Sequence, residues 1–297
     1  MTSGAASPAA GEPIAIVAGN GRLPHYVAEA ARRAGNEPFI IRLSGESSDD
    51  WTGYSSMEAG LGAFAPVVAA LKQRGISKVV LSGGVRTRPE WSSLRPTFRI
   101  LLALPAIWRK LSSGGDDKVL RMVIALFEQH GFEIIGAQAI AGELLVGEGA
   151  LGAVTPDEKA RADIAAACEA ARAIGLLDIG QGAVSVGGRV VAVEGAEGTD
   201  QMLDRVRWMR EVDRVSPMRP GVLVKLCKPQ QEERADLPSI GPETVRAAIA
   251  AGLSGIAIEA GRALILDRAE TIRAADAAGL FIFGLTAAET EGGSAHG

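Results

Sequence analysis

Residues 13–24 read PIAIVAGNGRLP, and this stretch decides the fold class of the first half of the chain. Residues 13–18 form a short apolar run that ends in Gly19-Asn20-Gly21. Residues 23–34 then carry apolar side chains at helical spacing and stop at Gly35. A buried strand, a glycine turn and a helix in this order are typical of a parallel sheet with helices on its faces.

The same turn predicts a binding site. Glycines permit a tight turn and leave backbone N–H groups exposed to a phosphate at the start of the helix. Binding roles are therefore predicted for Gly19, Asn20, Gly21 and Leu23. The dinucleotide fingerprint is incomplete, because Pro24 stands where a third glycine is expected and Glu37 comes too early for the usual ribose-binding acid. A nucleotide or phosphate site and a plain tight turn both fit this pattern.

Further alternation follows along the chain. Strands are predicted over residues 37–43, 78–82 and 133–136, and helices over residues 64–74 and 119–130. The strand over 78–82 runs into Gly83 and Gly84, so a second glycine turn is expected at the same carboxyl edge of the sheet, where open α/β sheets bind ligands. Gly83, Gly84 and Arg86 are predicted to bind substrate there. Arg86 and Arg88 suit a diphosphate, although a solvated arginine loop is the alternative.

The second half alternates in the same way. After a glycine-rich break over residues 147–155, the capping sequence Thr155-Pro156-Asp157-Glu158 opens a long Ala-rich helix. A hairpin over residues 183–186 and 189–194 is expected about Gly187-Gly188. Helices are predicted over 199–210 and 242–251, and strands over 221–226, 255–259 and 281–285. The sequence therefore predicts an α/β protein of two domains. A Rossmann-like domain with a parallel sheet spans 13–150 and a second α/β domain spans 151–288, between a disordered leader over 1–12 and a flexible tail over 289–297.

Composition limits the function. The chain has 297 residues, 47% of them hydrophobic, a net charge of −4 and a pI near 5.6, which argues against nucleic-acid binding because phosphate backbones usually meet a broad basic surface. Neither a signal peptide nor an apolar run of membrane-spanning length is found. Cys168 and Cys227 form no metal or redox motif, so a reducing cytoplasm fits. Histidines are few, so a metal would be held by carboxylates and ligand phosphates, which points to Mg²⁺.

Charged loops supply the candidate chemistry. Asp116 and Asp117 begin a predicted helix, where acids serve as caps or can orient a sugar hydroxyl or share a magnesium ion. Residues 178–182 and 194–200 place acids and glycines on either side of the hairpin. Residues 225–241 follow a buried strand with a density of mixed charge that suits phosphate chemistry, although surface salt bridges are the alternative.

Residues 89–113 set Trp91, Phe98 and Trp108 among arginines and lysine around an apolar centre. Such an element suits an anionic membrane surface or acyl chains. A cap over the core or a contact in a homodimer is the alternative.

Taken together, these motifs resemble the LpxI family, in order and spacing, from residue 13 to residue 285. The resemblance implies Mg²⁺-dependent hydrolysis of UDP-2,3-diacylglucosamine in lipid A biosynthesis, yielding UMP and 2,3-diacylglucosamine 1-phosphate. It implies that the ligand is held between the two domains and that water is directed to the β phosphorus. A cytoplasmic protein at the surface of the inner membrane is expected from this substrate.

On this resemblance, Asp236 is the first candidate for a catalytic or metal-holding acid, followed by Glu197 and Asp200. Phosphate oxygens would face Lys225, Lys228 and Arg234, with Lys225 among the catalytic residues. The metal would be held by Asp236, Glu232 and Asp200. Further binding residues would be Asp116, Asp117, Gln181, Thr199 and Glu259. Glu232 departs from the family's usual Asp, and Gln138 stands where many relatives have histidine.

Two other functions compete with this one. The first glycine turn also suits a nucleotide-sugar or NAD-dependent oxidoreductase, for which Tyr26 and Tyr54 are the available tyrosines. A non-catalytic nucleotide-binding module would bind a UDP-sugar without turning it over.

Overall fold

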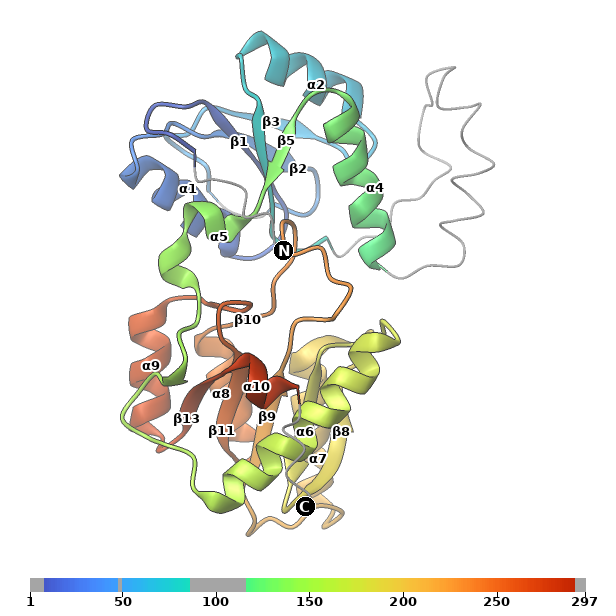
Figure 1. The fold of residues 1–297 in the computed structure, drawn as a ribbon, viewed down its shortest axis with the longest axis vertical. Helices are drawn as coiled ribbons and strands as arrows, with labels where there is room; N and C mark the ends of the chain where they lie inside the picture. The colour runs from blue at the N-terminus through green and yellow to red at the C-terminus, as the bar shows by residue number, and fades with distance from the viewer. Residues whose placement is uncertain (1–7, 48–49, 86–115, 292–297) are drawn as a thin grey trace. The chain divides into compact units, whose positions relative to one another are not determined.

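A computed structural model describes residues 8–47, 50–85 and 116–291, with the side chains of residues 116–118 excepted. Contacts divide the chain into two compact units (Figure 1). The first unit runs to Glu143 and also contains Glu232–Asp236, and the second comprises Leu144–Gln231 and the residues from Leu237 onward. The segment Glu232–Asp236 thus belongs by its contacts to the first unit, although it lies deep in the second half of the sequence.

The first unit contains a five-stranded, wholly parallel sheet in the order β3-β2-β1-β4-β5. Its strands are β1 (Ile14–Ala18), β2 (Phe39–Leu43), β3 (Ser56–Ala59), β4 (Lys78–Ser82) and β5 (Glu133–Ile135). Its helices are α1 (Leu23–Arg33), α2 (Phe64–Gln73), α4 (Asp116–Gln129) and α5 (Ala137–Ile140), and the 3-10 turn η2 (Gly142–Leu144) follows. This is the predicted parallel α/β sheet.

Alternate residues of the strands build two cores. Ala15 packs with Leu71 of α2 and Phe127 of α4 on one face of the sheet. The next residue, Ile16, packs with Val27 of α1 and Ala137 of α5 on the other face. A strand buried on both faces is apolar at every position, which explains the continuous hydrophobic run of residues 13–18.

The second unit contains a six-stranded mixed sheet in the order β6-β13-β11-β9-β7-β8. Its strands are β6 (Gly149–Ala150), β7 (Gly182–Val186), β8 (Arg189–Val193), β9 (Gly221–Lys225), β11 (Leu253–Glu259) and β13 (Phe281–Leu285), and a separate pair joins β10 (Ser239–Ile240) to β12 (Leu264–Ile265). β9, β11 and β13 are parallel to one another, whereas β7 is antiparallel to β9 and β8 is antiparallel to β7.

The helices of the second unit lie on both faces of this sheet. They are α6 (Glu158–Leu176), α7 (Gly198–Glu211), α8 (Pro242–Ala250), α9 (Arg268–Ala277) and α10 (Ala287–Thr290). Ile164 and Cys168 of α6 pack on one face, and Leu203 of α7 and Val245 of α8 pack on the other. This confirms the α/β class predicted for the second half.

Local signals explain how the second unit begins. The Asp157 side chain accepts a hydrogen bond from the Ala160 N–H at 2.8 Å, which caps α6 as the sequence predicts. The β7–β8 hairpin turns at Gly187 and Gly188, whose φ angles of 63° and 79° require residues without a Cβ. The buried Asp163 carboxylate holds this turn from α6, because it accepts hydrogen bonds from both glycine N–H groups and from Ser185 Oγ.

Several short elements and one longer helix are absent from the sequence prediction, and β3 and α9 show why. β3 is a four-residue edge strand with mostly exposed or half-buried side chains, so it lacks a strong apolar signal. α9 follows Asp267, which has a left-handed φ of 45° and makes no side-chain cap, so no capping signal marks its start. Both elements form because neighbouring elements pair or pack with them.

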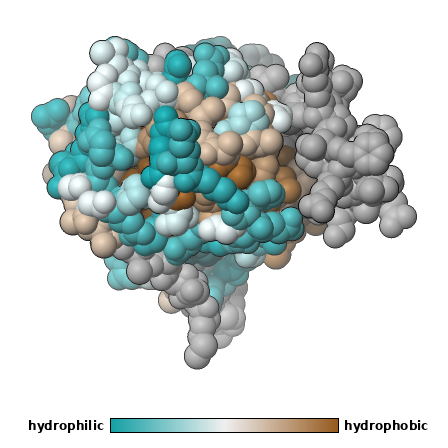
Figure 2. All heavy atoms as spheres, turned by 90° about the horizontal axis from the view of Figure 1, so that it is seen from above, coloured by the Kyte–Doolittle hydropathy of each residue, from teal (hydrophilic) through white to brown (hydrophobic). Residues whose placement is uncertain are grey.

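Figure 2 shows one face of the molecule, on which hydrophilic residues lie around a smaller apolar area. In the first unit, the large apolar side chains that are exposed among the described residues are Leu61 and Val85. No helix in the described ranges combines the length and apolar character needed to cross a membrane.

Candidate functional site

The two predicted glycine turns of the first unit meet at one place. β1 lies between β2 and β4, so the strand order reverses at the β1–β4 pair, and both turns leave this pair at its carboxyl edge. Asn20 and Gly84 exchange backbone hydrogen bonds of 2.7 and 2.9 Å, and the Gly19 N–H donates to Ser82 O at 2.8 Å. Open α/β sheets bind ligands at such a reversal point.

Close approach of these turns requires glycine. A Cβ on Gly19 would lie 2.5 Å from Gly84 O. Gly83 has a φ of +86°, and a Cβ there would lie 2.7 Å from Asn20 O and 2.9 Å from Pro24 Cγ. The turns are therefore packed backbone to backbone. The sequence Gly19-Asn20-Gly21 contributes to this contact, in addition to any part it has in binding a ligand.

The groups around this reversal point suit an anion. Helix α1 begins next to the turn without a side-chain cap on its first N–H groups. The Ser82 side chain is 4% exposed, and its Oγ has no hydrogen-bond partner among the described residues. A buried hydroxyl without a partner is costly, and the uncapped start of a helix favours an anionic ligand group.

The segment Glu232–Asp236 is held in the first unit by charge and by packing. Arg234 donates from Nε and Nη2 to the two oxygens of Glu232 at 2.8 and 3.0 Å, and from Nη1 to Glu128 at 2.8 Å. The Gln138 amide donates to Glu233 O at 3.1 Å, and Ala235 packs against the core. The Arg234 hydrogen bonds lower the pKa of Glu232 and outweigh the opposing effect of its partial burial.

Asp236 ends this segment. Its N–H donates to Glu232 O at 3.1 Å, so the segment closes on itself in one turn. The Asp236 residue is exposed. A fixed backbone with an exposed carboxylate is what a ligand-facing acid needs.

In the second unit, the sheet gathers polar residues along one edge. Lys225 ends β9, and Glu259 ends the parallel strand β11. Gly182 begins the antiparallel strand β7 and pairs with Lys225, and Ala183 pairs with Val193 near the end of β8. The end of β8, the start of β7 and the carboxyl ends of β9 and β11 therefore share one edge, with the start of α7 following β8.

Glu194 is the central acid of this edge. It is 7% exposed, accepts a hydrogen bond from Thr199 Oγ1 at 2.8 Å and approaches the Gln181 N–H at 3.4 Å. A Cβ on Gly180 would lie 2.2 Å from Glu194 O, and one on Gly182 would lie 2.7 Å from Glu194 Oε2. The glycines of residues 178–182 thus make room for this carboxylate, which joins the two acid-containing loops that flank the hairpin.

The loop after β9 is fixed from several sides. Glu259 accepts from the Cys227 N–H at 3.0 Å and from Arg262 Nη1 at 2.7 Å. The Gln231 amide oxygen accepts from the Lys228 N–H at 3.0 Å. Lys228 Nζ donates to Asp178 at 2.6 Å. Glu259 therefore acts on the position of the loop, and the Lys228 ammonium is oriented by Asp178.

Lys225 differs from Lys228 in its surroundings. It is 6% exposed, and its Nζ donates to Ser239 O at 3.2 Å. In the described part of the chain, no carboxylate forms an ion pair with it. Burial of an ammonium with one neutral acceptor is unfavourable unless an anion joins it.

The start of α7 lies beside these groups. Glu197 precedes the helix and pairs with Arg205 at 3.0 Å, and Asp200 lies in the first turn and is exposed. Thr199 donates its hydroxyl to Glu194, so no side chain caps the helix. The uncapped N–H groups and the helix dipole favour a negative ligand group at this end.

The amino-acid sequence of the chain is similar to a known family over almost its whole length. Residues 13–144 match the LpxI N-terminal domain, and residues 147–283 match the LpxI C-terminal domain. The chain belongs to the LpxI family. It is 43% identical over 273 residues to the UDP-2,3-diacylglucosamine pyrophosphatase LpxI of Caulobacter vibrioides, an alignment that covers 92% of this chain and 97% of the relative.

A solved structure, the C-terminal domain of the coenzyme A biosynthesis bifunctional protein CoaBC, is similar over 33% of this chain and 60% of its own. Its identity of 18% and TM-score of 0.23 support no inference about this LpxI family member.

The predicted site residues of the LpxI family member fall into two groups. Gly19, Asn20, Gly21, Leu23, Gly83, Gly84, Glu232, Arg234 and Asp236 belong to the first unit. Gln181, Glu197, Thr199, Asp200, Lys225, Lys228 and Glu259 belong to the second unit and lie on or next to one edge of its sheet. Arg86 and residues 89–113 lie outside the described residues, as do the side chains of Asp116 and Asp117, whose backbone begins α4.

The structure adds residues that the prediction left out of the site. Glu194, Asp178 and Gln231 orient the predicted groups of the second unit, and Ser82 ends β4 at the reversal point of the first. Glu194 carried a usable signal, because it follows an apolar strand and is separated from Glu197 by two small residues. Asp178 acts through its contact with Lys228, which is fifty residues away and which no local pattern reveals. Gln231 acts within its own loop, on the Lys228 N–H three residues before it.

The described side chains do not form a protein-only metal cage. Among them, no group of three or more His, Cys, Asp or Glu is placed to hold a metal. Both oxygens of Glu232 already accept from Arg234, whereas Asp200 and Asp236 are exposed. Magnesium is commonly bound by one or two carboxylates together with substrate phosphates and water, and an exposed Asp200 or Asp236 fits that kind of site.

Proposed function

We propose that this protein hydrolyses the pyrophosphate of UDP-2,3-diacylglucosamine and releases UMP and 2,3-diacylglucosamine 1-phosphate. The observation that carries the proposal is the match to both LpxI domains, together with 43% identity over nearly the full length of a relative named for this activity. The oxidoreductase alternative has no such support. Its candidate Tyr54 packs against Trp51 and under Arg32.

The second unit supports the proposal with groups suited to a phosphate. Lys225 has a buried ammonium, Lys228 has one oriented by Asp178, and α7 has uncapped N–H groups. Positive groups held in place stabilise the charge that develops on phosphate oxygens as water attacks phosphorus and the bridging P–O bond breaks. We assign Lys225 and Lys228 to the phosphate oxygens.

The first unit supports the proposal through the reversal point of its sheet. The exposed turns at Gly21 and Gly83 and the start of α1 present backbone donors suited to phosphate or nucleotide oxygens. Asp236 is our first candidate for the catalytic acid, with Glu197 and Asp200 next. Glu197 is paired with Arg205, whereas Asp200 is exposed, which makes Asp200 the better placed of these two carboxylates.

We propose Mg²⁺ as the cofactor, held by Asp236 or Asp200 together with phosphate oxygens. When bound, it supplies neutralisation of phosphate charge. Glu232 is the weaker candidate for this role because Arg234 occupies both of its oxygens.

The deciding experiment measures UMP release from UDP-2,3-diacylglucosamine by purified protein in magnesium and after chelation. The proposal expects release in magnesium and its loss on chelation. No release under any condition would support a non-catalytic binding module. UMP release that persists after chelation would contradict the Mg²⁺ requirement and would still support the hydrolase activity.

Two further measurements refine the mechanism. Asp236→Asn is expected to slow UMP release on the order of a hundredfold or more, as for loss of a charge-stabilising group. Near-normal release would transfer the role to Asp200. In ¹⁸O-labelled water, attack on the β phosphorus places the label in 2,3-diacylglucosamine 1-phosphate, whereas label in UMP would mean attack on the α phosphorus.

We also propose that the protein works in the cytoplasm at the inner-membrane surface, where a diacylated substrate resides, and that residues 89–113 contribute to membrane contact or to a homodimer. The support is the basic and aromatic composition of this segment. Sedimentation with anionic vesicles and light scattering of the purified protein, each with and without residues 89–113, separate the two roles.

A further inference from the structure

A cavity of about 450 Å³ lies at the edge of the second unit's sheet that is opposite to the candidate site. Its walls are the end of β7, the start of β8 and the loop between α7 and β9. Val186 at the end of β7 pairs with Gly221, the first residue of β9, whereas Lys225 is the last residue of β9. The strand β9 therefore separates this cavity from the phosphate-facing edge.

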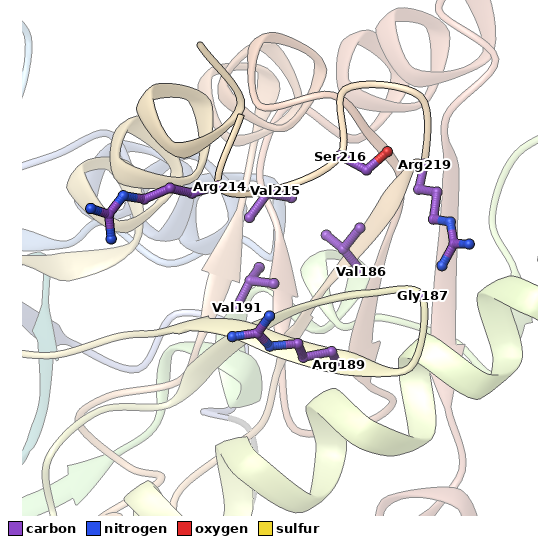
Figure 3. A pocket seen from close by; sticks show the side chains of 8 residues that line it. All are labelled: Val186, Gly187, Arg189, Val191, Arg214, Val215, Ser216 and Arg219. Atoms are coloured by element: carbon purple, nitrogen blue, oxygen red, sulfur yellow. The ribbon is translucent and has the colours of Figure 1, made fainter. Parts of the chain in front are cut away.

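The lining combines arginines with valines. Eight residues form it: Val186, Gly187, Arg189, Val191, Arg214, Val215, Ser216 and Arg219. We call this cavity the arginine pocket. It has three guanidinium groups, an apolar floor of three valines and no acidic residue in its lining. Figure 3 shows Arg189 and Arg219 on opposite sides of Val186, and Arg214 on the rim with its guanidinium turned outward.

The three guanidinium groups of the pocket stand apart from most arginines of the second unit. Arg189, Arg214 and Arg219 make no side-chain hydrogen bond or ion pair with any other residue that the structure describes. By contrast, Arg205 pairs with Glu197, and Arg207 pairs with Asp204 and Glu211. Three unpaired positive groups around one cavity in a chain of net charge −4 create a local attraction for an anion.

Arg210 builds one wall of the pocket. Its guanidinium donates to Ser216 O at 2.5 Å, Arg219 O at 2.9 Å, Ala251 O at 2.6 Å and Gly252 O at 3.1 Å. Burial lowers the pKa of Arg210, because desolvation disfavours the charged guanidinium. The loop that carries Ser216 and Arg219 is thereby fixed to α7 and to the turn after α8.

The opposite wall is fixed as well. Asp163 accepts hydrogen bonds from the N–H groups of Gly187 at 3.1 Å and Gly188 at 2.7 Å. Gly187 leaves space for Arg219, because a Cβ at Gly187 would lie 3.2 Å from Arg219 Nη1. The backbone of both walls is therefore fixed by hydrogen bonds to Asp163 and Arg210. The guanidinium groups on these walls have no hydrogen-bond acceptor in the described part of the chain. A preorganised wall with unsatisfied donors is favourable for binding.

We propose that the arginine pocket binds a phosphate-bearing small molecule, with its phosphate on Arg189 and Arg219 and its uncharged body on the valine floor. Guanidinium groups bind phosphate in a planar, two-bond geometry. The cavity volume falls within the range of ligand pockets and exceeds the needs of a phosphate ion alone. A nucleoside monophosphate has the required size and combination of anion and flat body. The site is separate from the candidate active site, so this proposal does not depend on the proposed hydrolysis.

The test titrates the full-length protein with UMP and follows the valine methyl resonances by NMR. The resonances of Val186, Val191 and Val215 are expected to shift in a saturable way, and inorganic phosphate is expected to bind at least about tenfold more weakly, because it cannot contact the valine floor. These three valines line the pocket, so saturable shifts confined to them distinguish binding here from UMP bound at the active edge.

The matched variants separate the pocket from general charge. Arg189→Gln/Arg214→Gln/Arg219→Gln is expected to weaken the UMP-dependent shift at least about tenfold, since charge-assisted hydrogen bonds are lost. Arg207→Gln removes an exposed, paired arginine of α7 and is expected to leave the affinity within about twofold. UMP release from UDP-2,3-diacylglucosamine, if present in the wild type, is expected to be unchanged in the triple variant.

Several outcomes would overturn the proposal. These are the absence of a valine shift at millimolar UMP, an equal affinity for phosphate and UMP, or an undiminished shift in the triple variant. Binding of anionic phospholipid vesicles without UMP binding would assign these arginines to a membrane surface instead. Melting curves of the triple variant and of Arg189→Gln and Arg219→Gln alone verify that the fold is retained.

Discussion

Substitution of Lys225 by Met tests whether the buried ammonium serves ligand chemistry or the fold. Met keeps an unbranched side chain of similar length and removes the charge. Lys225 is 6% exposed as a residue, and its ammonium has one hydrogen bond, of 3.2 Å, to Ser239 O. Its loss leaves a carbonyl without this donor, which costs about 1 kcal/mol, and removes a buried charge whose desolvation is of similar or larger cost. The free energy of unfolding is therefore expected to change by no more than about 1 kcal/mol in either direction.

Catalysis is expected to respond much more strongly. A positive group placed for developing phosphate charge contributes about 2.7–4 kcal/mol, so Lys225→Met is expected to reduce kcat for UMP release by a factor of about 10²–10³. Lys225→Arg keeps the charge and is expected to retain more activity than Lys225→Met. Urea unfolding of each variant gives stability, and UMP release gives kcat.

The matched control for these variants is Lys159→Met, because Lys159 is an exposed residue of α6. It is expected to change stability by at most about 0.5 kcal/mol and to leave kcat unchanged. A loss of more than about 2 kcal/mol of stability in Lys225→Met with activity retained would refute the ligand role and assign Lys225 to the fold.

Three further predictions concern the buried and paired groups. Asp163→Ala is expected to lower the free energy of unfolding in urea by about 2–4 kcal/mol, because the fully buried Ser185 hydroxyl and two glycine N–H groups lose their acceptor. Glu169→Ala, on the exposed face of the same helix, is expected to be nearly neutral. A neutral Asp163→Ala would contradict the role of Asp163 in holding the turn. Arg234 lowers the pKa of Glu232, so the stabilising effect of the Glu232 carboxylate is present above its unfolded pKa and is lost as the pH falls through the lower folded pKa. The difference in unfolding free energy between wild type and Glu232→Gln should therefore shrink as the pH falls below about 4.5. A difference that stays constant with pH would argue against the pairing of Glu232 with Arg234. Burial raises the pKa of the Cys168 thiol to about 12, so iodoacetamide at pH 8 should label Cys168 only after denaturation, and rapid native labelling would disprove its enclosure in the core.

The main elements of the fold could be predicted because their signals are local. The apolar run before Gly19 and the capping sequence before α6 each specify an element through a few neighbouring residues. The edge strand β3 and the helix α9 lacked such signals. β3 forms by pairing Ile40–Leu43 of β2 with Ser56–Ala59, and this pairing depends on a partner distant in sequence.

The site was predicted in its residue types and only partly in its arrangement. Lys225, Lys228 and Asp236 were identified as one dense segment, yet the chain divides that segment, with Glu232–Asp236 packing in the first unit and the lysines remaining in the second. The reason is that Arg234 forms an ion pair with Glu128 and that the Gln138 amide donates to Glu233 O. Each of these contacts joins residues about a hundred positions apart in the sequence. Spacing within the segment contains no trace of those contacts.

The sequence by itself determined the α/β class, the two glycine turns, the hairpin and the kind of chemistry that the charged loops allow. These follow from apolar period, from glycine's access to positive φ and from residue type, all of which act over a few positions. Only the tertiary structure decided that the turns at Gly19 and Gly84 pack against each other, that Glu194 lies against Gly180 and Gly182, and that the buried Lys225 donates to Ser239 O. Within each unit, strand order and direction bring the groups of that unit to one edge of its own sheet. Strand order and direction are set by the packing of whole sheets and helices.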